Sequence, residues 1–415
     1  MMFRIRLLTI TVGLAVAGLF SVTAHAQQAL PSARLLDRYG LEVLWSSQAV
    51  MHQNRDHVMN VEIDEESVYV QSQNGFVSAF DSQSGNRRWA QLVGRINSPQ
   101  LPLTSNSDTV LVTSGVKLYA IDKWQGGELW RLSLQEQAGA RPTADEERIY
   151  VATQHGSVFA YDLSKIYELY HSGRLPKWSK QTELWRHRTS RPIHTPPIRY
   201  DDQLTFASQT NIIYSVRPKT DRLVFQMTTS SHVTAPMVQY GEYLFMCNDS
   251  QHVYCLDKAL GTTVWDFISR SKVTQKPRFV NNRCYVSPVA GSLYCIDVNT
   301  GVEYWEAQES VKFVAVTDSY VAAEDELGNL LLLSPNSTET DVELTARLPF
   351  KGFKYKVSND LTDRIYMVSD FGQVICLREK SNSFPKFFRN PDRRPIEPLF
   401  TDENAAAAEP TDDNQ

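Results

Sequence analysis

The sequence predicts an all-β fold: a closed eight-bladed β-propeller of four-stranded antiparallel blades, with a seven-bladed ring as the alternative. Three observations predict it. A tryptophan recurs about every forty residues behind the same aspartate and glycine, short runs of alternating apolar residues recur with the same period, and no segment shows a helical period. Stacked repeats also allow a chain of 415 residues to form one body.

The repeated aspartate, glycine and tryptophan keep a fixed spacing of four residues between successive members. The complete copies are Asp81, Gly85 and Trp89; Asp122, Gly126 and Trp130; Asp257, Gly261 and Trp265; and Asp297, Gly301 and Trp305. An altered copy keeps the spacing with Arg217, Asp221 and Phe225. Asp162 begins a further copy, in which an insertion displaces the tryptophan to Trp185.

Each repeated residue has a structural role. The aspartate accepts hydrogen bonds from the backbone of its own turn, and the glycine supplies the positive φ that closes the hairpin. The tryptophan begins the outermost strand and packs its ring between neighbouring blades. Trp45 precedes Trp89 by about one period and has no third strand before it. We therefore expect Trp45 to supply the outer strand of the last blade and close the ring.

Third strands are expected to start near residues 75, 115, 156, 211, 251, 291, 328 and 372. The last two are not followed by the aspartate–glycine–tryptophan pattern. The ring would have seven blades if the seventh of these units were not a true blade.

The repeat is typical of a known family. Segments of the form Gly-x-Val/Leu-Tyr-x-x-Asp-x-x-x-Gly-x-x-x-Trp, most clearly Gly291 to Trp305, resemble the PQQ-like repeat. Quinoprotein alcohol dehydrogenases share it with BamB-type propellers of the outer-membrane β-barrel assembly machinery. The resemblance covers roughly residues 41 to 380 and implies the fold. It leaves the function open because the repeated residues are structural, although similarity to BamB-type proteins implies a role in outer-membrane protein assembly.

No motif in the sequence predicts catalysis. Quinoprotein dehydrogenases resemble one another in a vicinal disulfide and a calcium-binding carboxylate set, and neither can be placed here. Haem-attachment, zinc-protease, nucleophile-elbow and phosphate-loop motifs are also missing. We therefore expect no enzymatic activity, no cofactor and no metal site. A PQQ- or metal-dependent oxidoreductase is one alternative, and a binder of an anionic cell-wall polymer or polysaccharide is another.

The five cysteines occupy second and third strands. Cys255, Cys295 and Cys376 lie at the third-strand position where other blades carry Ala79 or Ala160, so a small residue is required there. The other two, Cys247 and Cys284, lie on adjacent second strands. Buried free thiols are the preferred interpretation, with a disulfide between neighbouring strands as the alternative.

The chain ends indicate export. Arg4 and Arg6 precede the apolar run Leu7–Phe20, and Ala24-His25-Ala26 suits signal-peptidase cleavage, so residues 1–26 are predicted to be a signal peptide. An uncleaved anchor is the alternative, and no cysteine follows for lipidation. Residues 27–40 are expected to be a linker and residues 381–415 a disordered Pro-rich and acidic tail. The predicted location is the periplasm or the exterior.

Cations are concentrated ahead of the second strands, where the innermost strands should begin. The expected set is Arg95, Arg141, Arg191, His194, His232, Lys272, Lys276, Lys312, Lys354 and Lys356. Converging around the axis, they would form a positive funnel at one mouth for an acidic ligand or an envelope protein partner. The alternative is ordinary loop charge that extends into solvent. Neither nucleic-acid binding nor a transmembrane segment after signal removal is expected, and we expect a monomer.

A second candidate surface is the insertion of residues 163–183. It contains Tyr167, Tyr170, Arg174 and Trp178, which are favoured contact residues. It could contact a partner, or it could only pack on its own blade.

Overall fold

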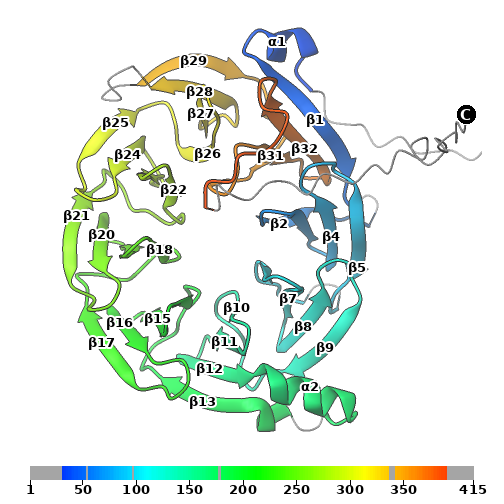
Figure 1. The fold of residues 1–415 in the computed structure, drawn as a ribbon, viewed down its shortest axis with the longest axis vertical. Coiled ribbons are helices and arrows are strands. Elements are labelled where there is room, and N and C mark those ends of the chain that lie inside the picture. Colours follow the sequence, from blue (N-terminus) through cyan, green and yellow to red (C-terminus); the bar gives the residue numbers. More distant parts are fainter. Residues whose placement is uncertain (1–29, 53–54, 96–97, 176–178, 336–341, 390–415) are drawn as a thin grey trace, which may run out of the picture.

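The computed structural model describes residues 30–52, 55–95, 98–175, 179–335 and 342–389. These residues form eight four-stranded sheets arranged as blades around a central axis (Figure 1). The predicted eight-bladed β-propeller is confirmed. The seven-bladed alternative is wrong, because the seventh unit is a complete sheet. The predicted signal peptide lies outside the described residues.

The first four blades follow one another along the chain, and each runs from an inner to an outer strand. Blade 1 contains β2 (Val58–Ile63), β3 (Ser67–Ser72), β4 (Phe76–Asp81) and β5 (Arg87–Leu92). Blade 2 contains β6 (Thr104–Ser105), β7 (Thr109–Ser114), β8 (Lys117–Asp122) and β9 (Glu128–Ser133). Blade 3 contains β10 (Thr143–Ala144), β11 (Arg148–Ala152), β12 (Ser157–Asp162) and β13 (Glu183–Arg188). Blade 4 contains β14 (Ile198–Tyr200), β15 (Gln203–Ser208), β16 (Ile212–Val216) and β17 (Leu223–Thr228).

The remaining blades complete the circle, and the last takes its outer strand from the start of the chain. Blade 5 contains β18 (Val238–Tyr240), β19 (Tyr243–Cys247), β20 (His252–Asp257) and β21 (Thr263–Ile268). Blade 6 contains β22 (Arg278–Val280), β23 (Arg283–Val286), β24 (Leu293–Asp297) and β25 (Glu303–Ala307). Blade 7 contains β26 (Lys312–Val316), β27 (Val321–Glu324), β28 (Leu330–Pro335) and β29 (Val342–Leu348). Blade 8 contains β30 (Tyr355–Lys356), β31 (Ile365–Val368), β32 (Gln373–Glu379) and β1 (Leu41–Gln48).

The ring closes through the antiparallel pair β1 and β32. Their register runs from Leu41 opposite Glu379 to Gln48 opposite Gln373, with Trp45 opposite Cys376. The prediction that Trp45 supplies the missing outer strand is confirmed. Because the two ends of the chain share one sheet, blade 8 has the same four strands as its neighbours.

Five outer-strand aromatic rings lie on the turn between the third and fourth strands of the next blade: Trp45, Trp89, Trp185, Phe225 and Trp265. The Trp89 ring covers Gly126 so closely that a Cβ added there would lie 2.5 Å from Trp89 Cγ. Its Nε1 donates a hydrogen bond of 2.7 Å to the carbonyl oxygen of Lys123. The same bond joins Trp45 to Ser82 (3.1 Å), Trp185 to Pro218 (2.7 Å) and Trp265 to Val298 (2.9 Å). Packing and one hydrogen bond therefore fix each of these tryptophan rings to the next blade.

The turns form as their residues predict. Asp122 Oδ1 accepts hydrogen bonds from the backbone N–H groups of Trp124 and Gln125, at 2.9 and 2.6 Å. Gly126 adopts a φ of +76°, which an L-residue rarely adopts. In the altered copy, Asp221 takes the glycine's place with a φ of +55°. The positive φ is therefore kept without a glycine, on a turn that still receives the Trp185 ring of the preceding blade.

The β-sheet register explains the small residue in each third strand. Trp45 lies opposite Cys376, which in turn lies opposite Tyr366, and the two rings are 6.1 Å apart. The equivalent sets of second, third and fourth strand are Tyr69, Ala79 and Trp89; Tyr150, Ala160 and Trp185; Phe245, Cys255 and Trp265; and Tyr285, Cys295 and Trp305. A small residue in the middle lets two large rings share one face of the blade. All five cysteines are buried thiols that form no disulfide.

Among the described residues, two α-helices and one 3₁₀ helix stand outside the blades of this all-β fold, in segments where no helical period was expected. Helix α1 (Ala33–Asp37) lies in the expected linker and buries Leu36 against blades 7 and 8. Helix α2 (Leu163–His171) and η1 (Ser179–Thr182) lie in the insertion at the rim (Figure 1). Neither α-helix is long and apolar enough to cross a bilayer, among the residues that the structure describes.

Helix α2 replaces the hairpin turn of blade 3. Asp162 caps the helix by accepting a hydrogen bond of 3.2 Å from Lys165 N, so the repeated aspartate keeps its role in a different element. The Tyr167 ring meets the buried Trp130 ring edge-on at 6.5 Å, and Ile166 on the same helix is also buried. The insertion therefore packs on blades 2 and 3. Trp178 lies outside the described residues.

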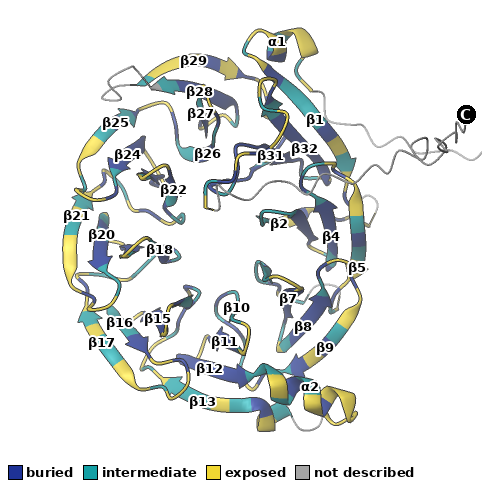
Figure 2. Ribbon diagram, in the orientation of Figure 1, coloured by how far each residue is buried: buried dark blue, intermediate teal, exposed yellow. Residues whose placement is uncertain are grey.

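The core of the molecule lies between successive blades. Second and third strands are almost wholly buried, whereas the outer strands alternate between exposed and buried residues (Figure 2). This pattern is what a four-stranded blade with one solvent-facing edge requires.

Gly126→Ala tests the packing of the tryptophan on the next blade. The new Cβ would overlap the Trp89 ring, so we expect a loss of about 1–3 kcal/mol in the free energy of unfolding. Gly115→Ala is the matched control, because Gly115 has a similar φ of +61° and a Cβ there meets no atom within 4 Å, so this variant should lose only the backbone strain of about 1 kcal/mol and less than Gly126→Ala. The measurement is the urea midpoint of each variant. Equal midpoints for the two variants would contradict this role for Gly126.

Candidate binding site along the axis

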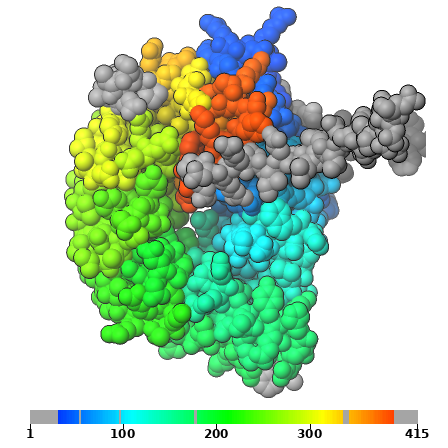
Figure 3. Space-filling model, viewed as in Figure 1, coloured from blue at the N-terminus to red at the C-terminus, as the bar shows by residue number. Residues whose placement is uncertain are grey.

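A cavity of about 990 Å³ lies at the centre of the ring. Figure 3 shows the hollow beside the orange-red C-terminal segment and between the green and cyan blades. Its walls are the inner strands and the connections that lead into them. Of the ten predicted mouth residues, the structure places five on its lining: Arg141, His194, Lys276, Lys312 and Lys356.

The other five predicted residues, Arg95, Arg191, His232, Lys272 and Lys354, are exposed in the connections between blades. These connections lie on the same face as the turns that join second to third strands, which we name the B–C face. Backbone hydrogen bonds of 2.9 Å tie the two kinds of loop together, from Asp249 N to His232 O and from Val289 N to Lys272 O. The predicted set is therefore divided between the cavity and this rim.

Carboxylates accompany half of the predicted cations. The ion pairs are Arg141 with Glu62 (3.2 Å), Lys272 with Asp249 (3.8 Å), Lys312 with Glu324 (4.0 Å), Lys354 with Asp370 (3.0 Å) and Lys356 with Glu324 (3.1 Å). These acidic residues lie on other strands and turns, outside the segments in which the cations were found. Positive charge is therefore partly offset around the mouth.

Asp360 is the buried acidic centre of the cavity. Its two carboxylate oxygens lie 2.8 Å from Arg278 Nη1 and 3.1 Å from Arg389 Nη2. Burial by itself would raise the pKa of Asp360, but Arg278, Lys276 and Arg389 outweigh it and hold that pKa below its usual range. The carboxylate is therefore ionised at all moderate pH values. Sequence patterns did not single out Arg278, Arg389 or Asp360.

At Lys276, burial and the neighbouring charges together lower the pKa. Burial lowers the pKa of its ammonium group to about 7, and the positive charges of Arg278, Arg389 and Arg141 act in the same direction against the attraction of Asp360. Burial also lowers the pKa of Lys312. Burial therefore disfavours the charged form of both lysines on the cavity wall.

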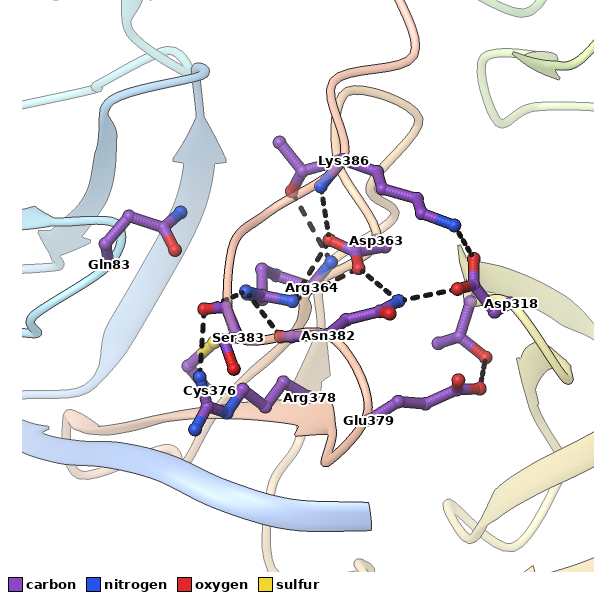
Figure 4. A network of polar contacts seen from close by, with 12 residues as sticks. Gln83, Asp318, Asp363, Arg364, Cys376, Arg378, Glu379, Asn382, Ser383 and Lys386 are labelled. Atoms are coloured by element: carbon purple, nitrogen blue, oxygen red, sulfur yellow. Dashed lines mark hydrogen bonds and ion pairs between the residues drawn. The ribbon is translucent and has the colours of Figure 1, made fainter. Parts of the chain in front are cut away.

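A network of polar contacts holds the C-terminal segment against blades 7 and 8 (Figure 4). Arg364 is fully buried and binds both carboxylate oxygens of Asp363 at 3.1 Å. The Nη2 atom of Arg364 donates to the carbonyl oxygens of Asn382 and Ser383, at 3.2 and 3.3 Å. Asp363 also accepts a hydrogen bond of 3.0 Å from Lys386 N. We name these residues the C-terminal clasp.

The clasp also reaches blade 7 and orders residues that were expected to be disordered. Asp318 accepts a hydrogen bond of 3.0 Å from Asn382 Nδ2 and pairs with Lys386 (Figure 4). Phe387 is buried and bridges to Thr362. Residues 381–389 are therefore part of the folded body, which extends beyond the boundary expected at residue 380. The clasp brings Arg389 to Asp360 in the cavity.

The B–C face also carries exposed apolar side chains at the tips of its turns. Phe371, Leu327 and Val289 belong to the adjacent blades 8, 7 and 6 and are 62%, 63% and 53% exposed. Val116 occupies the same kind of turn in blade 2 and is 52% exposed. Solvent-exposed apolar tips beside cations are a typical contact surface. Single apolar residues in turns show no periodicity, so the sequence pattern does not reveal them.

Metal-binding geometry is not found in the described part of the chain: no group of three or more His, Cys, Asp or Glu residues could hold an ion. His187, which the sequence leaves unassigned, pairs with Asp221 at 2.8 Å between blades 3 and 4.

The blade geometry, the docked tryptophans and the Asp-Gly turns define this chain as a PQQ-like repeat β-propeller. It belongs to the family described as outer membrane protein assembly factor BamB, which matches residues 73–229 and 182–387. The crystal structure of BamB from Moraxella catarrhalis is similar at 17% sequence identity with a TM-score of 0.61, over 81% of this chain and 97% of that one. The computationally designed Ika8 protein is similar at 12% identity with a TM-score of 0.60, over 80% and 99%. No curated protein sequence matches the chain significantly.

Arg364→Met tests the C-terminal clasp. The substitution leaves Asp363 buried without its cation, so the free energy of unfolding should fall by about 3–5 kcal/mol. Arg217→Met removes an exposed pair with Asp202 and should cost about 0–1 kcal/mol. Urea midpoints followed by tryptophan fluorescence measure both. A small loss for Arg364→Met would show that the clasp contributes little to the fold.

Proposed function

We propose that this protein is a non-catalytic scaffold of the cell envelope that holds a protein partner on its B–C face, in outer-membrane protein assembly. Membership of a family described by that process supports the proposal. The predicted signal peptide, with Leu7–Phe20 followed by Ala24-His25-Ala26, supports a periplasmic location.

The observation that carries the proposal is the composition of the B–C face. Three adjacent blades present Val289, Leu327 and Phe371 to solvent, and Lys272 and Lys354 flank them. Interfaces commonly combine an apolar centre with a charged rim. The apolar tips supply the burial, while the cations favour an acidic partner surface.

The turns of this face are rigid enough to present such a surface. Phe371 follows Asp370, whose carboxylate pairs with both His57 and Lys354 at 3.1 and 3.0 Å. The Phe371 ring lies 5.7 Å from the His57 ring. A turn held by several contacts loses little conformational entropy on binding.

A photo-crosslinking amino acid at position 371, in the full chain within its native envelope, tests the proposed face. We expect a crosslinked protein from position 371 and none from position 260, since Leu260 is equally apolar and 68% exposed on the opposite face. A crosslink from position 260 alone would overturn the assignment of the face.

Phe371→Ser combined with Leu327→Ser gives a second measurement on the same partner. We expect recovery of the co-purifying envelope protein to fall at least tenfold, because the apolar contact area is lost. Leu260→Ser combined with Val302→Ser, exposed at 68% and 62% on the opposite face, is the control and should leave recovery unchanged. Lys356 is unsuitable for such surface changes because it is buried against Glu324.

Incubation with PQQ and Ca²⁺ tests the absence of quinone-dependent catalysis. After gel filtration we expect the quinone absorbance to elute apart from the protein. Co-elution at one equivalent, together with alcohol-dependent reduction of a dye, would show instead that the protein is an oxidoreductase.

A further inference from the structure

Lys276 is the one predicted mouth residue on the cavity wall that combines a lowered ammonium pKa of about 7 with no hydrogen bond or ion pair to any described residue. It lies in the connection between β21 and β22, two residues before Arg278. The nearby carboxylate, Asp360, is already bound by Arg278 and Arg389. Asp360 still attracts Lys276 through space, but no described carboxylate forms an ion pair with Lys276 within 4 Å.

The cluster around Lys276 has an excess of positive charge. Arg141, Arg278 and Arg389 all act electrostatically on Lys276, from blade 3, blade 6 and the C-terminal segment. Against these four cationic groups stand two carboxylates, Asp360 on the two arginines and Glu62 on Arg141. Two positive charges are therefore in excess when Lys276 is protonated.

The cavity has the size and the electrostatics to hold an anion. Its volume of about 990 Å³ accommodates a hydrated oxyanion with room to spare. Low-dielectric walls concentrate the field of the surrounding cations on this space. A guanidinium group can donate two parallel hydrogen bonds to two oxygens of a phosphate or sulfate group, whereas an ammonium group acts as a point charge.

We propose that the axial cavity binds an oxyanion with two or more negative charges, a phosphate or sulfate group, with Lys276 as its direct ligand and Arg141, Arg278 and Arg389 around it. The site is independent of the proposed partner on the B–C face. The clasp contributes to it, because the clasp holds Arg389 in the cavity.

Isothermal titration of the full chain with sodium sulfate, at constant ionic strength set by chloride, tests the proposal. We expect one site whose affinity falls at least tenfold in Lys276→Met. Lys272→Met is the matched control, because it removes the same charge from a rim lysine paired with Asp249, and it should bind as the wild type does. Absence of a saturable site for sulfate and pyrophosphate, or equal binding by Lys276→Met, would overturn the proposal.

Proton uptake separates a bound ligand from a general salt effect. With a pKa of about 7, Lys276 is mostly neutral at pH 8 in the empty cavity, and an anion that binds it restores the ammonium form. Sulfate does not titrate in this range, so titrations in two buffers of different ionisation enthalpy should give uptake approaching one proton at pH 8 and much less at pH 6. Arginines stay charged and Asp360 stays ionised over this range. His194→Asn identifies any proton taken up by the histidine on the same wall. No uptake at pH 8 would contradict the role of Lys276.

The stability of the unliganded protein checks that Lys276→Met folds. Because the folded pKa of Lys276 lies below that of an unfolded lysine, the unfolded chain binds more protons between about pH 7 and 10, and wild-type stability should rise over that interval. Lys276→Met should lack this rise and melt at a higher temperature than the wild type at pH 6. Inorganic pyrophosphate and glycerol phosphate, titrated in parallel, distinguish a free polyanion from the phosphate of a headgroup or polymer. Tighter binding of either one identifies the source.

Discussion

Everything in this molecule depends on the contact between the outer-strand aromatic ring of one blade and the third-to-fourth-strand turn of the next. The ring buries a large apolar surface against a glycine that has no side chain to exclude it, and its Nε1 satisfies a turn carbonyl that would otherwise be buried without a partner. Among the described residues the contact recurs at five of the eight blade junctions, and at each of these one blade positions its neighbour. Trp45 extends it across the join between the two chain ends.

Two blades lack this contact, and the packing that replaces it shows what the contact requires. Before blade 3, Trp130 is covered by Tyr167 of α2 instead of by a turn glycine, so a helix provides the burial that the hairpin cannot. In blade 7 the large and small partners are exchanged, with Leu332 in the third strand opposite Ala346 in the fourth. Both solutions keep one large and one small side chain across the sheet. The packing volume is therefore the constraint, and the tryptophan is its commonest solution.

The same circular geometry creates the chemistry of the axis. Inner strands from all blades converge there, so side chains that are far apart in the sequence approach one another. Asp360 meets Arg278 from blade 6 and Arg389 from the C-terminal segment, and Lys276 is left with cations around it. Low-dielectric walls make such imbalances consequential, because neither charge nor counter-charge is fully screened by water.

The sequence by itself predicted eight blades, with seven as the alternative, the ring closure by Trp45 and the turns that carry the repeat. These depend on local residues at a fixed spacing: an aspartate that organises a turn, a glycine that allows a positive φ, and an aromatic residue that must be buried. It also placed cations near the axis. Only the tertiary structure decided that Lys356 is buried against Glu324, that Lys276 forms no ion pair with the described residues, and that Arg389 reaches Asp360 in the cavity. Charge pairing depends on which atoms meet across blades, and no repeat spacing records that distance.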